Sequence, residues 1–142
     1  MMTARDIMHN NAECVDANES LSEAAQRMRD DHVGALPICG NDNRLHGIIT
    51  DRDIVVKCIA GGHDPNTVTA GQLADDRLIW VEAETEIHDC LQMMEDNSVR
   101  RVPVLDNRKL VGMISEADIA QHLSEDEVAE FVERVYAAPP NN

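Results

Sequence analysis

The sequence predicts an α+β fold built from two β-α-β-β-α repeats, and three observations in its 142 residues support this class. One motif occurs twice, in 47–53 and in 112–118: a glycine, two apolar residues, a hydroxyl residue and, three positions after the hydroxyl residue, an Asp. A helical apolar period also occurs twice, 66 positions apart, and an extended stretch with a proline follows each time. Duplicated order and spacing indicate an internal repeat, so we expect two similar halves related by a pseudo-two-fold axis.

Composition and charge narrow the class of protein. The chain is 43% apolar with one Trp, one Tyr and one Phe, which predicts a globular protein with an aliphatic core. A net charge of -15 disfavours nucleic acids and anionic membrane surfaces as partners. The sequence contains neither a membrane-length apolar run nor a signal peptide at its first residues. We therefore predict a cytoplasmic protein, and the sequence leaves leaderless export open.

The repeats divide the chain into three segments: a first repeat in 1–64, a second repeat in 65–123, and a C-terminal helix with a flexible tail in 124–142. Each repeat opens with Thr-Ala and continues into a brief β-like run, 13–15 or 79–81. Because a unit of about 65 residues buries only a small core by itself, we expect the two repeats to share a single hydrophobic core.

The helices that follow carry the clearest periodicity in the chain. In each helix, apolar residues fall at i, i+3, i+4 and i+7, which places them on one face. We expect each helix to bury this face. The residues are Leu21, Ala24, Ala25 and Met28 in the first repeat and Ile87, Cys90, Leu91 and Met94 in the second.

A hairpin and a second helix close each repeat. Pro37 and Pro103 lie on the extended stretches, and a proline, which has no backbone donor, favours an edge strand or a strand start. Turn residues in 40–43 and 106–109 lead into the third strand of each repeat. We expect the closing helices in 50–60 and 115–123.

A final helix is expected after Ser124, because residues 124–127 resemble a capping box. Its apolar side can pack on the core or on a second subunit. That side carries Val128, Phe131, Val132 and Val135.

This arrangement, with a proline on the second strand and a Gly-apolar-apolar-Thr/Ser-x-x-Asp junction in both repeats, resembles a pair of CBS domains, the Bateman module. The resemblance covers about residues 3–123, and it is specific because both junction motifs agree in order and spacing. The acidic chain is also similar to the small hypoxia-response CBS proteins of mycobacteria. The resemblance implies a homodimeric stress-response module that binds an adenosine nucleotide or a similar ligand in two clefts between the repeats.

Carried over residue by residue, the resemblance implies that Thr50 and Asp53 hold the ribose hydroxyls of AMP or ATP in one cleft, and that Ser115 and Asp118 do so in the other. A helix N-terminus suits phosphate, and a carboxylate accepts hydrogen bonds from vicinal hydroxyls. The same spacing is also that of a hydroxyl N-cap with an acidic residue at N3, worth about 1 kcal/mol without any ligand. Both interpretations stay open.

Some features count against a nucleotide and against equivalent clefts. The second motif has Ala117 where the first has Arg52. The near absence of aromatic residues removes the usual stacking surface for adenine. Few cations are placed to meet phosphate; they are Arg52, Lys57, Arg100 and Arg101.

Zinc binding is the alternative. Cys58 and His122 fall at nearly matching positions when the closing helices are aligned, and His63 follows Cys58 by five residues. One thiolate and two imidazoles would form an incomplete zinc shell, completed by water or a second chain. The competing interpretation, which we prefer, is that Cys58 packs as a small apolar residue and the histidines face solvent.

The other cysteines have separate roles. Cys14 and Cys39 lie on neighbouring strands of one repeat, where a disulfide is feasible and would close a loop of about 25 residues. In a reducing cytosol they would be buried thiols, which is the state we predict. Cys90 is expected in the core. Surface or loop positions are expected for His9, His32, His46 and His88.

The sequence contains no nucleophile elbow, P-loop or HExxH motif, so we expect no enzyme. We predict a stand-alone, homodimeric CBS pair that senses an adenosine-type ligand. The alternative is a zinc-binding structural or stress-response dimer without nucleotide binding, and a third is a secreted effector that binds host proteins.

Overall fold

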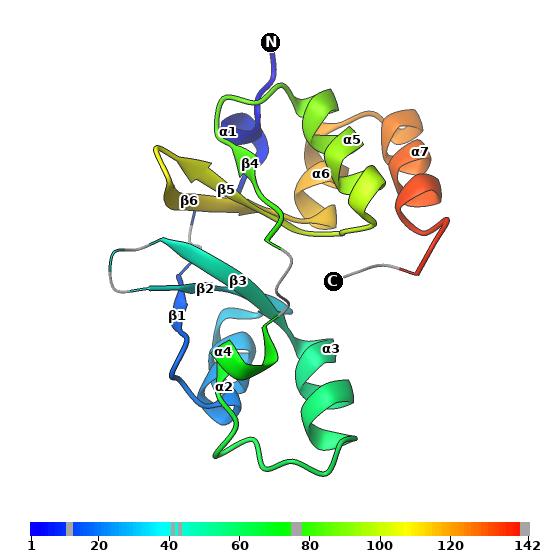
Figure 1. The fold of residues 1–142 in the computed structure, drawn as a ribbon. Coiled ribbons are helices and arrows are strands. Elements are labelled where there is room, and N and C mark those ends of the chain that lie inside the picture. Colours follow the sequence, from blue (N-terminus) through cyan, green and yellow to red (C-terminus); the bar gives the residue numbers. More distant parts are fainter. Residues whose placement is uncertain (11–12, 41, 43, 75–77, 140–142) are drawn as a thin grey trace. The chain divides into compact units, whose positions relative to one another are not determined.

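The computed structural model describes residues 1–10, 13–40, 42, 44–74 and 78–139 (Figure 1). The described parts of Ala12–Leu78 form one compact unit, here called the first-repeat unit. Those of Met1–Asn11 and Ile79–Asn142 form another, the second-repeat unit.

The first-repeat unit contains a three-stranded sheet in the order β1-β2-β3. β1 runs parallel to β2, and β2 runs antiparallel to β3. The elements are β1 (Val15–Asp16), α2 (Leu21–Asp31), β2 (Ala35–Cys39), β3 (Leu45–Thr50), α3 (Asp51–Asp53), the π-helix η1 (Ile54–Ile59) and α4 (Ala70–Leu73).

The second-repeat unit has the same topology, in the order β4-β5-β6, which confirms the duplicated α+β architecture. Its helices α5, α6 and α7 gather on one side of the sheet (Figure 1). The elements are α1 (Ala4–Ile7), β4 (Val81–Glu82), α5 (Ile87–Asn97), β5 (Val102–Asp106), β6 (Lys109–Ile114), α6 (Glu116–His122) and α7 (Glu125–Val135).

The opening helix of each repeat packs in the unit formed by the other repeat. In α1, the N–H of Ala4 donates to the carbonyl of Thr85 at 2.9 Å. In α4, the N–H of Gly71 donates to the carbonyl of Ala17 at 2.8 Å, and a Cβ on Gly71 would lie 2.9 Å from that oxygen. The compact units therefore differ from the sequence boundaries at 1–64 and 65–123, because the free N–H groups of these short helices find carbonyls beyond their own repeat.

Buried apolar residues form one cluster in each unit, in place of the single shared core expected from the sequence. Both clusters are aliphatic as predicted, and Phe131 is the aromatic residue within the described core. The predicted face of α5 is fully buried, while Ala25 is the exposed member of the α2 face. In α7, Phe131 and Val135 are buried against the second-repeat unit, whereas Val132 is 41% exposed.

The proline-containing strands are the middle strands of their sheets, so the expectation of edge strands is wrong. The reason lies in the length of the outer parallel strand. β1 pairs only with Ile38 and Cys39, so Pro37 lies before the start of the parallel ladder. Pro103 precedes the β4 pairing in the same way.

The turns and closing helices follow the sequence prediction with one change. Asn107 and Arg108 both have left-handed backbone, with φ of 53° and 69°, as the tight hairpin requires. Part of the 40–43 turn lies outside the described residues. The helix after Thr50 changes from α to π at Ile54, and its i to i+5 bonds place Ala60 N–H on the Val55 carbonyl. No helix in the described chain is long and apolar enough to cross a membrane.

Candidate functional site

The motif of the first-repeat unit lies where β3 passes directly into α3. Thr50 is 2% exposed, and its Oγ1 accepts a hydrogen bond from the Asp53 N–H at 3.1 Å. Oδ2 of Asp53 in turn accepts from the Thr50 N–H at 3.1 Å. These two bonds form a capping box, so the pair stabilises the helix start without a ligand.

The other carboxylate oxygen of Asp53 meets a cation. Oδ1 lies 3.3 Å from Nζ of Lys57, one helical turn later, and the two side chains are 22% and 51% exposed. An exposed ion pair of this kind contributes at most about 1 kcal/mol. A ligand hydroxyl can therefore replace the ammonium group at Asp53 with little loss.

The motif of the second-repeat unit has the same capping box and one additional partner. Asp118 is 8% exposed, and its Oδ2 accepts from the N–H of Ser115 at 2.8 Å and from its hydroxyl at 3.0 Å. The same oxygen lies 2.7 Å from Nδ1 of His9. The sequence prediction of a surface or loop position missed this contact, because 109 residues separate His9 from Asp118.

Arg100, one of the cations proposed for phosphate, is held by the end of α7. Its Nη1 donates to the hydroxyl of Tyr136 at 3.1 Å, and its guanidinium lies 5.7 Å from the centre of that ring. The Tyr136 hydroxyl donates to Oε1 of Glu116, the residue after Ser115, at 3.0 Å. The C-terminal helix thus brings its own hydroxyl and ring to the motif of the second-repeat unit.

The three candidate zinc ligands have different surroundings. The Cys58 thiol is buried and donates to the His63 carbonyl at 3.5 Å, whereas the His63 side chain is exposed. His122 belongs to the second-repeat unit, and its Nδ1 lies 2.8 Å from the carbonyl of Asp118. Since a carbonyl only accepts, Nδ1 carries a proton, and in the neutral imidazole the lone pair is then on Nε2. Within the described ranges, no three His, Cys, Asp or Glu side chains are grouped to hold a metal ion.

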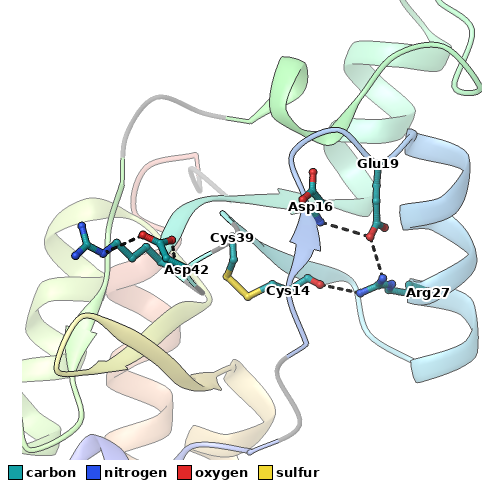
Figure 2. The surroundings of a disulfide bond; sticks show 7 residues. Cys14, Asp16, Glu19, Arg27, Cys39 and Asp42 are labelled. Atoms are coloured by element: carbon teal, nitrogen blue, oxygen red, sulfur yellow. Dashed lines mark hydrogen bonds and ion pairs between the residues drawn. A yellow bond between two sulfur atoms is a disulfide. The ribbon is translucent and has the colours of Figure 1, made fainter.

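The structure joins Cys14 and Cys39 in a disulfide between the start of β1 and the end of β2 (Figure 2). Their Cα atoms lie 5.4 Å apart, as parallel neighbouring strands allow. The candidate disulfide is therefore present, and the expectation of two reduced thiols is wrong. Arg27 supports the bridge by donating to the Cys14 carbonyl at 2.8 Å and to Glu19 at 3.0 Å.

The remaining cysteine and a second histidine lie on α5. Cys90 is buried as predicted, and burial raises the pKa of its thiol to about 11. His88 is exposed, with Nε2 2.8 Å from Glu127 of α7 and Nδ1 2.7 Å from Glu86. The bond to Glu127, followed by that to Glu86, raises the pKa of His88. The sequence prediction did not find this link between α5 and α7.

A family model described as "CBS domain" matches this chain twice, at residues 4–59 and 70–125. The chain belongs to the CBS-domain family. The two matches contain both strand-to-helix junctions and both capping boxes described above, and they confirm the resemblance drawn from the repeated motif.

Three matches show what this chain is similar to. Hypoxic response protein 1 of Mycobacterium tuberculosis is 53% identical over 135 residues, which are 95% of this chain and 94% of the relative. A crystal structure of Hypoxic Response Protein I with two coordinated zinc ions is 54% identical, with a TM-score of 0.80 over 87% of this chain and all of that chain. CBSX2 in complex with AMP is 22% identical, with a TM-score of 0.73 over 85% and 95% of the two chains, and shares the fold.

Proposed function

We propose that this CBS-pair protein is a regulatory module, without catalysis of its own, that binds an adenosine nucleotide at Thr50 and Asp53. The observation that carries the proposal is the Asp53 carboxylate, one oxygen of which pairs with the exposed ammonium of Lys57. A carboxylate suits vicinal ribose hydroxyls, and Lys57 and Arg52 supply positive charge for phosphate next to it. The duplication makes Ser115 and Asp118 the second candidate site.

The AMP complex of CBSX2 supports the ligand class, because that protein has the same fold. Millimolar AMP should raise the melting temperature of the wild-type protein. A ligand at 100 times its Kd stabilises the folded state by about 2.7 kcal/mol. Asp53→Ala should abolish the AMP-induced rise, measured against the same variant without AMP.

Asp51→Ala is the matched control, since Asp51 is an exposed carboxylate in the same helical turn. It should keep the AMP-induced rise. An unchanged melting temperature with AMP, or an equal rise in Asp53→Ala, would contradict nucleotide binding at this junction.

Zinc binding is the second candidate, and the relative crystallised with two zinc ions supports it. In this chain, the free lone pair on Nε2 of His122 suits a metal ligand, because hydrogen bonding of Nδ1 fixes the tautomer. Cys58 and His63 are the other candidate ligands. The buried Cys58 thiol would have to lose its proton to bind zinc.

Native mass spectrometry of the purified chain tests this candidate together with subunit number. Zinc should be present in the wild-type protein and lost in Cys58→Ser and His122→Ala. His32→Asn is the control, because His32 is exposed and has left-handed backbone that Asn tolerates. Metal-free wild-type protein, or full zinc content in both ligand variants, would exclude these residues as ligands.

A further inference from the structure

His9 is held beside Asp118 by its backbone as well as by its side chain. Its N–H donates to the Met113 carbonyl at 3.0 Å, and its carbonyl accepts from the Met113 N–H at 3.1 Å. Gly112 permits this close approach, since a Cβ there would lie 2.6 Å from Sδ of Met8 and 2.8 Å from the His9 oxygen. The imidazole is therefore placed by β6, the strand that leads into the motif.

His9 is one of three donors to Oδ2 of Asp118, beside the N–H and the hydroxyl of Ser115. A carboxylate oxygen has two lone pairs, so these donors fill its accepting capacity. The serine hydroxyl can rotate to another acceptor, whereas the imidazole is fixed by its backbone bonds to β6. A pair of vicinal hydroxyls is best bound by both oxygens of a carboxylate. At Asp118, His9 blocks this mode at Oδ2. At Asp53, Oδ2 accepts from the Thr50 N–H, and Oδ1 pairs with the exposed ammonium of Lys57.

The sequence of the first-repeat unit has a different residue type at the position aligned with His9. Thr69 and Ala70 follow Thr3 and Ala4 by 66 positions. With this offset, the residue aligned with His9 is Asp75. The structure of Asp75 lies outside the described residues. An ionised carboxylate side chain accepts hydrogen bonds and has no proton to donate, unlike an imidazole N–H.

We propose that His9 takes the place of ligand hydroxyls at Asp118, so that a nucleotide binds this chain at Asp53 and not at Asp118. The inference rests on the proposed function and extends it, because it names the residue that decides which repeat binds the ligand. His9 acts by occupying the acceptor oxygen, which makes it a specificity-determining residue.

Calorimetric titration of the full chain with AMP tests this assignment. The wild-type protein should bind one AMP per chain, with binding lost in Asp53→Ala and kept in Asp118→Ala. His9→Ala should gain a second AMP that Asp118→Ala removes, with affinity at that site rising at least about tenfold, the order of one charge-assisted hydrogen bond. His9→Gln, whose amide can still donate, should keep a single site, and circular dichroism checks the fold of each variant.

The result separates the inference from the function on which it rests. Two AMP molecules on the wild-type chain, Asp118-dependent binding in the wild type, or no gain in His9→Ala would overturn the role of His9. An equal gain in His9→Gln would overturn it too. If the wild-type protein binds no AMP and His9→Ala gains a site that depends on Asp118, the role of His9 is supported and the Asp53 site is refuted. If His9→Ala fails to fold, titration of the wild-type protein, Asp53→Ala and Asp118→Ala still decides whether AMP binds at Asp53 and not at Asp118.

Discussion

Histidines make long-range polar contacts in the second-repeat unit. His9 reaches Asp118 across 109 residues, and His88 joins Glu86, the N-cap of α5, to Glu127 in the first turn of α7. An imidazole with a carboxylate at each nitrogen needs protons on both nitrogens to donate to both. The contact that His88 makes between the two helices therefore depends on its charge.

This charge predicts a pH-dependent contribution to stability. The pKa of His88 is raised above its usual 6.5, mainly by Glu127 and then by Glu86. A raised pKa means that the contribution is complete below 6.5 and is lost as the pH rises through the raised value. His88→Gln should lose this part of the pH dependence, measured by urea unfolding between about pH 5.5 and pH 8.5. His32→Asn should retain it, and equal slopes in wild type and His88→Gln would contradict the prediction.

The outermost strand of each sheet has only two residues, and each repeat secures it differently. β1 is tied to β2 by the Cys14–Cys39 disulfide. The β4 side is tied by Arg5 of α1, which forms ion pairs with Glu84 at 2.8 Å and with Asp106 at 2.7 Å. A two-residue strand contributes few ladder bonds of its own, so these links hold it in place.

The disulfide should therefore stabilise the first-repeat unit strongly. It spans 25 residues, and closing a loop of this size is worth about 3 kcal/mol. Cys14→Ser, or dithiothreitol with the wild-type protein, should lower the free energy of unfolding by about this amount in urea denaturation. Dithiothreitol should have no further effect on Cys14→Ser. An unchanged midpoint for reduced wild type would show that the bridge adds no stability.

Self-association of the whole molecule has to overcome a net charge of -15. Like charge opposes pairing, so a dimer needs an apolar contact surface. η1 offers one, because Val55, Val56 and Ile59 are 59%, 48% and 54% exposed. Such a group of exposed apolar side chains on one helix is typical of an interaction surface.

We expect the wild-type chain to be a homodimer by light scattering, and Val55→Asp with Ile59→Asp to convert it to a monomer. Val132→Asp is the control, because Val132 is an exposed apolar residue on α7 and the change adds one negative charge, as each substitution of the double variant does. A monomeric wild-type chain would contradict the expected dimer. A double variant that remains dimeric would place the dimer contact outside η1.

Local spacing in the sequence determined the duplicated β-α-β-β-α order, the buried face of α5 and the caps at Thr50, Ser115 and Ser124. These features are readable because the interacting residues lie within one or two helical turns of each other. The candidate residues of the motif followed from the same spacing.

Only the tertiary structure decided which segments meet. It packs α1 with the second repeat and leaves Pro37 on a middle strand. It also sets His9 against Asp118. None of these contacts has a local pattern, because each depends on where a distant backbone presents a free carbonyl, a short partner strand or a carboxylate. The two motifs are alike in sequence and differ in the structure for that reason.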